Sequence, residues 1–322
     1  MLSGGRAVAA PRGLGIEAHR GGAGLMTEST LEAFTNALGI GVSTLELDVR
    51  LTEEGRPVVI HDRRIGAATC SDTGAAVAGD PEFPYVGDLV GRLSVAQLAT
   101  LDCGRRQLPG FPTQQVVRGA RIPSLEEVLS LVACDRASGV RLAIEPKYAA
   151  ARRDETTTRA RLAGTVLRAV RSAGLVDRVT IDGFDWRLLM RVRRLEPAVR
   201  VVATASPHSL ERGRPGASPW LGGLDIDDFG GDLVRAAAAI GVHGIAPLHG
   251  RAGLTFTTRG MVRRAHRAGL TVVPWNADEP AVIGRLIDAG VDGVTTNYPD
   301  RVRAVAAGRG LALPAPVAGG GC

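Results

Sequence analysis

The stretch LEAFTNALGIGVSTLELDV (residues 31–49) joins a helical pattern to a short apolar strand through two glycines. The same order returns in LRAVRSAGLVDRVTIDGF (167–184), VRAAAAIGVHGIAPL (234–248), MVRRAHRAGLTVVPW (261–275) and IGRLIDAGVDGVTTN (283–297). Glycine at the end of a helix fits the left-handed cap, and an apolar strand suits a sheet covered by helices. This alternation predicts βα units around a parallel sheet.

Ten segments have the composition of strands. They are residues 16–19, 44–49, 58–62, 141–147, 179–184, 199–204, 223–229, 244–248, 271–275 and 293–297. Residues 58–62 follow 44–49 across TEEGRP, which favours a hairpin, and residues 223–229 lie in a stretch rich in Gly, Pro and Ser. Without these two, eight strands remain, and we predict a (β/α)8 barrel with one domain spanning residues 1–322. A doubly wound open sheet is the rival fold, but no glycine fingerprint follows the first strand.

The rhythm stops between Asp62 and Ile122. A segment of this length is too long for an ordinary loop, so we expect residues 63–121 to form a small inserted lobe over one end of the sheet. The barrel would span about residues 15–305, and a flexible tail would follow from about 308 to 322. Capping-box spacing at Ser29 with Glu32, and at Ser124 with Glu127, predicts two helix starts.

The composition argues against several classes of function. The net charge of +6 comes from dispersed arginines rather than a basic block with aromatics, so we expect no nucleic-acid partner. A mild positive field still favours anionic substrates. The sequence has no run of about 18 apolar residues, so it predicts no membrane span. Its start lacks the apolar core of a secretory signal. These features predict a cytoplasmic protein without stable membrane insertion; the oligomeric state stays open.

Carboxylates gather at the ends of two predicted strands. Residues i and i+2 of a strand share one face, so TLELDV presents Glu46 with Asp48, and RLAIEPK presents Glu145 with Lys147. Three carboxylates from two strands, if they lie near one another, suit a single hard cation, Mg²⁺ or Ca²⁺. The alternative is ion pairing with arginines at the barrel rim. Lys147 is the sole lysine among 39 basic residues, which itself asks for a reason.

Two histidines stand at comparable strand ends, His19 after residues 16–18 and His61 within VVIHD. A histidine in this place is often only a hydrogen-bonded core residue. Beside a carboxylate cluster, however, the pair becomes a candidate for acid–base catalysis. The other four histidines lack such company, and we interpret them as structural or exposed. The acidic run at Asp225, Asp227 and Asp228 is interpreted as a solvated turn.

Seven motifs together resemble the glycerophosphodiester phosphodiesterase family. In chain order they are AHRG, TESTLEAF, LELDVRLTEEGRPVVIHD, IEPK, GFDW, VPWNADEP and VDGVTTNYPD. The resemblance runs from about residue 15 to 305 and implies a (β/α)8 barrel with an inserted lobe. It implies that Glu46, Asp48 and Glu145 are metal ligands and that His19 and His61 are catalytic. It also implies that Arg20 and Lys147 bind the phosphate and that Phe184 and Trp275 line the substrate pocket.

The chain departs from the family's pattern in two places. The family usually has Pro-Glu-Asn-Thr where this chain has Thr-Glu-Ser-Thr (27–30), and often has serine where Gly183 stands. The second change affects a detail of the pocket. Cys70 and Cys103 resemble a pair found in exported relatives, so the resemblance offers a disulfide and an exported protein as the alternative to the cytoplasm.

The resemblance implies metal-dependent hydrolysis of a small-molecule glycerophosphodiester to glycerol 3-phosphate and an alcohol. One alternative is a related barrel phospholipase that acts on phospholipid or sphingomyelin, but no aromatic-rich amphipathic stretch offers a membrane-docking surface. Another is a barrel that binds a ligand without catalysis. Such a protein would be expected to have lost a ligand or a histidine, whereas all seven polar positions are present.

Overall fold

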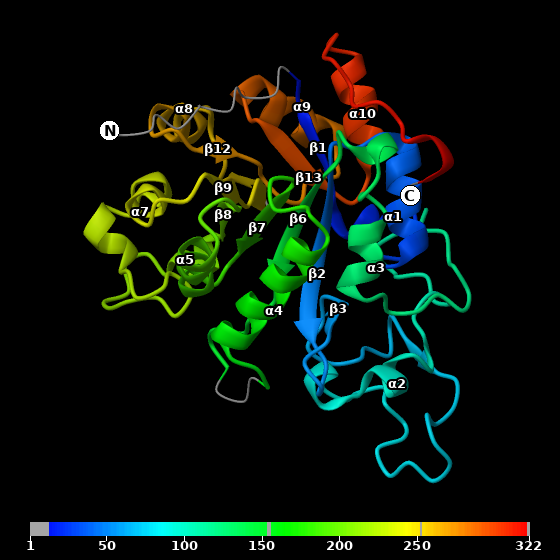
Figure 1. Ribbon diagram of the computed structural model, residues 1–322. Helices are drawn as coiled ribbons and strands as arrows, with labels where there is room; N and C mark the ends of the chain where they lie inside the picture. Colours follow the sequence, from blue (N-terminus) through cyan, green and yellow to red (C-terminus); the bar gives the residue numbers. More distant parts are fainter. Residues whose placement is uncertain (1–12, 153–155, 252, 321–322) are drawn as a thin grey trace.

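A computed structural model describes residues 13–152, 156–251 and 253–320, and eight parallel strands form its centre (Figure 1). Around the sheet they run β12–β9–β8–β7–β6–β2–β1–β13. Their bounds are β1 Gly15–Ala18, β2 Thr44–Leu51, β6 Arg141–Pro146, β7 Val179–Gly183, β8 Arg200–Ala205, β9 Gly244–Pro247, β12 Thr271–Val272 and β13 Gly293–Thr296. The predicted (β/α)8 barrel is confirmed.

The barrel is nearly closed, and its remaining gap lies between β12 and β13, the two end strands of this order. The backbone N–H of Asp292 donates to the carbonyl of Val272 at 2.9 Å, and that of Thr295 donates to Pro274 at 3.0 Å. Pro274 has no N–H to donate in return, so a regular ladder cannot continue there. This explains why β12 is only two residues long, where the sequence predicted a strand over 271–275.

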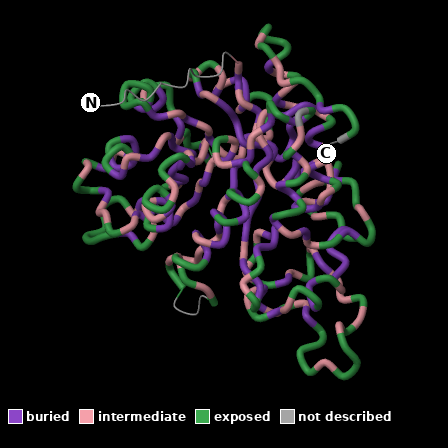
Figure 2. Tube along the Cα trace, in the orientation of Figure 1, coloured by how far each residue is buried: buried purple, intermediate pink, exposed green. Residues whose placement is uncertain are grey.

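Helices cover the outside of the sheet (Figure 1). They are α1 Leu31–Ile40, α3 Leu125–Ser130, α4 Arg159–Ser172, α5 Trp186–Leu195, α7 Leu233–Ala239, α8 Arg259–Arg267, α9 Pro280–Ala289 and α10 Pro299–Ala307. The short helices α2 (Val95–Leu98) and α6 (Pro207–Leu210) lie in loops. The strands and the inner faces of the helices are buried (Figure 2), and fully enclosed side chains such as Phe34 and Trp186 belong to one continuous core.

The two predicted helix starts have different outcomes. Ser124 and Glu127 form a capping box at the start of α3. At α1 the prediction was wrong by one residue, because the cap is Thr30, whose hydroxyl accepts from Ala33 N–H at 3.1 Å. Ser29 adopts a left-handed backbone with φ 58°, which a residue entering a helix as its cap does not have.

The two candidate strands set aside in the sequence are not barrel strands. β3 (Pro57–Val59) pairs antiparallel with β2, with Val49 opposite Val59. Residues Ile226–Phe229 form a 3₁₀ turn, η4, and the Asp225 side chain accepts from Asp227 N–H at 2.9 Å. The hairpin brings the chain back along β2 toward the site.

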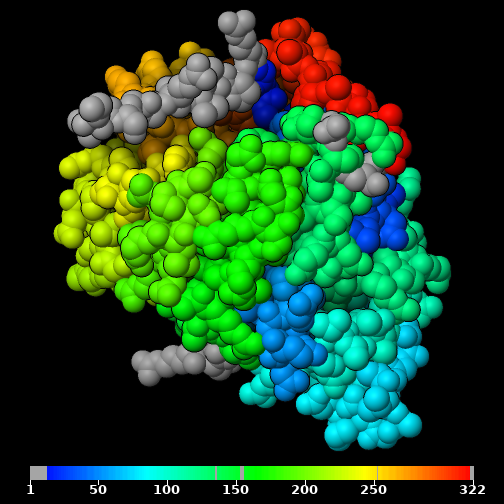
Figure 3. Space-filling model, in the orientation of Figure 1, coloured from blue at the N-terminus to red at the C-terminus, as the bar shows by residue number. Residues whose placement is uncertain are grey.

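The inserted lobe projects from one end of the barrel (Figures 1 and 3). Its strands β4 (Ser71–Asp72) and β5 (Leu101–Asp102) pair antiparallel, and a disulfide joins Cys70 to Cys103 with an S–S distance of 2.07 Å. A second apolar core, centred on the enclosed Tyr85 and Leu101, holds the lobe together. The disulfide that the resemblance offered is therefore present.

The chain after α10 differs from the flexible tail expected from residue 308. Val317 is buried and its N–H donates to the carbonyl of Leu38 in α1 at 3.0 Å, so the described part of this segment packs on the barrel. Cys322 lies outside the described residues. Among the helices of the described ranges, none has the length and apolar character needed to cross a membrane.

Candidate active site

The turn after β1 places His19 and Arg20 at the end of the barrel where the parallel strands have their carboxyl ends. Arg20 adopts a left-handed backbone with φ 52°, and Gly21 follows at φ 82°. A Cβ on Gly21 would lie 2.8 Å from Cβ of Ala33 in α1, so only glycine lets the turn pack this closely. The turn directs the N–H of Arg20 to Glu46, whose Oε2 accepts at 2.9 Å. A strained non-glycine backbone held this firmly is typical of functional sites.

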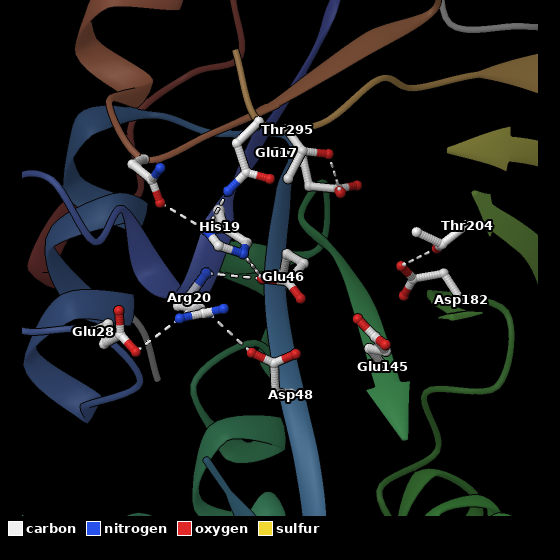
Figure 4. A network of polar contacts seen from close by, with 12 residues as sticks. Glu17, His19, Arg20, Glu28, Glu46, Asp48, Glu145, Asp182, Thr204 and Thr295 are labelled. Carbon is white, nitrogen blue, oxygen red and sulfur yellow. Dashed lines mark hydrogen bonds and ion pairs between the residues drawn. The ribbon is translucent and has the colours of Figure 1, made fainter. Parts of the chain in front are cut away.

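Three carboxylates meet beside this turn (Figure 4). Asp48 on β2 pairs in register with Glu145 on β6, and Glu46 lies two residues earlier on the same face. One oxygen of each lies within 4.8 Å of the other two. Asp48 is 1% exposed, and its Oδ2 accepts no aligned hydrogen bond from the described residues. This set of three carboxylates, which offers oxygen ligands alone, fits a hard divalent cation.

Two cations flank Asp48. Arg20 Nε lies 3.1 Å from Asp48 Oδ2, and Lys147 Nζ lies 3.3 Å from Asp48 Oδ1 and 3.1 Å from Glu145 Oε2. Arg20 is also held by Glu28, whose Oε1 lies 2.9 Å from NH1. Both cations therefore stand where a phosphate bound beside the carboxylates would meet them.

The charges of the site are strongly interdependent. Burial alone would raise the pKa of Asp48, but Lys147 and Arg20 lower it below its usual range. For Glu46, burial and then the neighbouring Asp48 raise the pKa well above the usual value. Burial opposes the charge of Lys147, yet Glu145 and Asp48 raise its pKa. A divalent cation would relieve the repulsion that Glu46 experiences.

His19 is oriented by a chain of polar contacts. Its Nδ1 lies 2.7 Å from Asn297 Oδ1, and the amide of Asn297 donates through Nδ2 to Asp278 Oδ2 at 2.7 Å. Asp278 thus fixes the Asn297 oxygen toward the ring, which assigns the proton to Nδ1 and leaves Nε2 with a lone pair. Nδ2 of Asn276 also lies 2.7 Å from Nδ1. If the nitrogen and oxygen of this amide exchange places, the Asn276 oxygen becomes a second acceptor for the Nδ1 proton. Burial and then Arg20 lower the pKa of His19 to about 3.

His61 lies two residues beyond β3 at the boundary with the lobe. Its Nδ1 is 2.8 Å from Asp62 Oδ1, and its side chain is 35% exposed. Arg50 donates through Nε to the His61 carbonyl at 2.8 Å. A narrow crevice between barrel and lobe is lined by His61, Glu28 and the disulfide cysteines, among others, so this imidazole is accessible from solvent.

Aromatic rings stand at the ends of β7 and β12. The rings of Phe184 and Trp275 pack edge to face with centroids 5.4 Å apart, and Trp275 donates through Nε1 to the carbonyl of Ala246 at 2.8 Å. Trp220, which sequence analysis did not assign, adds a third ring 6.3 Å from Phe184. Trp220 comes from the long segment after β8, so no motif spacing could have placed it.

The structure brings together all seven polar residues expected at the site and adds others. Glu17 and Asp182 face the barrel interior near the same end (Figure 4). The i, i+2 rule could have found both, since Glu17 precedes His19 by two and Asp182 precedes Phe184 by two. Asn297 and Asp278 could not be assigned in this way, because Asn297 is 278 positions from its partner His19 and Asp278 acts through Asn297.

The model of the glycerophosphoryl diester phosphodiesterase family matches residues 19–301. The chain belongs to this family. A glycerophosphodiester phosphodiesterase of Caldanaerobacter subterraneus is 24% identical over 88% of the chain and 94% of the relative. A crystal structure described as a putative glycerophosphoryl diester phosphodiesterase of Silicibacter pomeroyi is 30% identical, with a TM-score of 0.77 over 94% of this chain and 96% of that one.

A phosphodiesterase of Oleispira antarctica, solved with the product sn-glycerol-3-phosphate, shares the fold with a TM-score of 0.66 and 19% identity over 91% of this chain and 96% of that one. Family membership and its glycerophosphodiester phosphodiesterase relatives make this chain a phosphodiesterase. The cluster of Glu46, Asp48 and Glu145 offers three carboxylate ligands to a metal ion.

Proposed function

We propose that the protein hydrolyses glycerophosphodiesters to glycerol 3-phosphate and an alcohol, with one Mg²⁺ or Ca²⁺ ion. The observation that carries this proposal is the carboxylate cluster of Glu46, Asp48 and Glu145. Two cations, Arg20 and Lys147, flank this cluster. The glycerophosphodiester phosphodiesterases among its relatives, and the product held by the Oleispira antarctica enzyme, support the choice of substrate.

Glu46, Asp48 and Glu145 would hold the metal ion. A bound divalent cation supplies Lewis-acid polarisation of the phosphoryl oxygens and neutralises charge in the transition state. Arg20 and Lys147 bind the remaining phosphate oxygens, which lets a nucleophile approach an anion. Because both cations are already fixed by Asp48, little side-chain entropy is lost when the substrate binds.

The histidines divide the proton transfers. His19 Nε2 carries the lone pair, since Nδ1 is bonded to Asn297, so His19 accepts the proton of the attacking hydroxyl. The new oxygen–phosphorus bond forms as the bond from phosphorus to the alcohol oxygen breaks. His61, at the accessible side of the site, donates a proton to that leaving oxygen. Attack by water gives glycerol 3-phosphate directly. Attack by the neighbouring glycerol hydroxyl, which gains from proximity, gives a cyclic phosphate, and water must then open this ring to yield glycerol 3-phosphate.

Product identity tests this function. Purified protein with glycerophosphocholine and Mg²⁺ should release choline and glycerol 3-phosphate. ³¹P NMR follows the conversion of glycerophosphocholine to glycerol 3-phosphate. His61→Ala, which removes the proposed acid, is the matched control and should release little of either. Formation of phosphocholine and glycerol, or no reaction at all with wild-type protein, would overturn the proposal.

A further inference from the structure

Asp182 is a carboxylate of the site to which the proposed mechanism gives no task. Ile144 pairs with Ile181 in the parallel register of β6 and β7, so the next residues, Glu145 and Asp182, lie level on neighbouring strands. Asp48 lies level with Glu145 on the other side. The three carboxylates therefore form a row across β2, β6 and β7 (Figure 4), with strands about 4.8 Å apart.

The hydrogen bonding of Asp182 is incomplete. Its Oδ2 is 3.4 Å from the Thr204 hydroxyl, a long contact, and its enclosed Oδ1 has no partner among the described residues. The other interior carboxylate, Glu17, differs, because Thr295 donates to its Oε1 at 2.7 Å. An enclosed polar oxygen without a partner is costly, which raises the question of what it bonds when the site is in use.

A glycine follows Asp182 on the side of the metal ligand Glu145. Gly183 adopts φ 154°, and a Cβ there would lie 3.5 Å from Cγ of Glu145. Asp182 itself is partly exposed. A ligand whose phosphate is held by Arg20 and Lys147 would extend its next atoms along this row of residues toward Asp182.

The chemistry of the site favours a hydroxyl at this place. The carboxylate of Asp182 has hydrogen-bonding capacity to spare, since its Oδ1 has no partner among the described residues and its Oδ2 has only the long contact with Thr204. A hydroxyl can donate to the ionised carboxylate or accept from the neutral acid, whereas an ammonium group suits only the ionised form. In the diester, the glycerol half carries free hydroxyls on the two carbons beyond the phosphate ester, whereas a choline half carries no free hydroxyl.

We propose that the carboxylate of Asp182 exchanges a hydrogen bond with a hydroxyl of the glycerol half of the substrate, which makes Asp182 a specificity-determining residue. This proposal rests on the proposed function, because it assumes a phosphate bound between Arg20, Lys147 and the metal ligands. It assigns the glycerol half to the β7 side of the site, beside Phe184, and the departing alcohol to the side of His61.

Calorimetric titration with two ligands tests the contact without turnover. Glycerol 3-phosphate and propyl phosphate have the same carbon skeleton and differ only in the hydroxyls. With Mg²⁺ present, wild-type protein should bind glycerol 3-phosphate about ten-fold more tightly, the scale of one hydrogen bond to a buried carboxylate. Asp182→Ala should lose most of this preference while its affinity for propyl phosphate changes little.

Two further variants sharpen the test. Glu17→Gln changes the interior carboxylate that already has a partner and should keep the wild-type preference. Asp182→Asn keeps the shape and one hydrogen-bonding group toward the ligand, so it should retain part of the preference. Equal binding of the two ligands by wild-type protein would overturn the proposal even if Asp182→Ala fails to fold.

A uniform loss of affinity for both ligands in Asp182→Ala would also overturn it, since Asp182 would then act only through the structure. Cleavage of glycerophosphocholine is measured in parallel. Wild-type protein that shows the ligand preference but releases no choline would refute the proposed hydrolysis while supporting the hydroxyl contact. Protein that releases choline without the preference would do the reverse.

Discussion

At the scale of single residues, the site is organised around Asp48. Arg20 approaches one of its oxygens at 3.1 Å and Lys147 the other at 3.3 Å, in a place that is 1% exposed. Burial of one carboxylate among others is tolerable only with such compensation. In the proposed function the same cations bind the phosphate, so the interactions that hold them beside Asp48 also prepare the site for the substrate.

The two histidines should be needed for turnover and not for folding. His19→Ala and His61→Ala should each lower kcat by about 10²–10⁴-fold, the usual effect of losing a general acid or base. Steady-state kinetics on glycerophosphocholine and thermal unfolding of each variant measure both parts. Near-normal kcat in either variant would show that its histidine is only structural.

Lys147 should resist replacement by arginine although 38 of the 39 basic residues are arginine. Its compact ammonium fits between Asp48 Oδ1 and Glu145 Oε2, at 3.3 and 3.1 Å. The planar fork of arginine needs more room and would bind Glu145 in bidentate fashion. Lys147→Arg should therefore lose most activity with an unchanged circular dichroism spectrum and Tm; wild-type kcat/KM would mean that charge alone suffices.

Glu17 should make the free protein less stable as the pH rises. Burial raises its folded-state pKa above 4.5, so above that pH the folded state holds a proton that the unfolded state has lost, and stability falls with increasing pH. Glu17→Gln keeps the acceptor for Thr295 without this cost. Glu17→Gln should be more stable than the wild type near pH 7 and equally stable near pH 4, measured by urea unfolding. An equal effect at both pH values would contradict the assignment.

At the scale of the elements, the repeated helix–glycine–strand pattern was enough to predict the barrel. The hairpin at β3 and the turn at η4 also followed from local composition. The length of β12 did not, because Pro274 limits the ladder only in relation to β13. The carboxylates and Lys147 followed from strand spacing and Arg20 from the family resemblance, whereas Asn297 and Trp220 reach the site through tertiary contacts that no local pattern records.

The loop after the 3₁₀ turn η1 (His19–Gly21) shows how closely the elements pack. A Cβ on Gly24 would lie 2.4 Å from the ring of Tyr298, whereas one on Gly39 in α1 would meet nothing within 4 Å. Gly24→Ala should therefore destabilise the protein by about 1–3 kcal/mol through overpacking. Gly39→Ala should stabilise it by about 0.5–1 kcal/mol through helix propensity. Urea unfolding of the matched pair checks the signs, and a loss in both would contradict this packing.

At the scale of the whole molecule, the lobe braces the segment that leads from Arg20 to Glu28. Gln114 of the lobe donates to the carbonyl of Ala23 at 2.7 Å, and Thr27 N–H donates to the carbonyl of Gln115 at 3.0 Å. The ion pair of Glu28 with Arg20 thus depends on contacts from more than 80 positions along the chain. The disulfide within the lobe keeps open the alternative of an exported protein.

The central claim for the whole molecule is that Glu46, Asp48 and Glu145 hold a divalent cation that hydrolysis requires. The most direct measurement follows glycerophosphocholine by ³¹P NMR with protein dialysed against EDTA, then with Mg²⁺ or Ca²⁺ restored. We predict no cleavage by the chelated protein and recovery of turnover with either ion. Full activity of the chelated protein, with no metal detected by elemental analysis, would contradict the account.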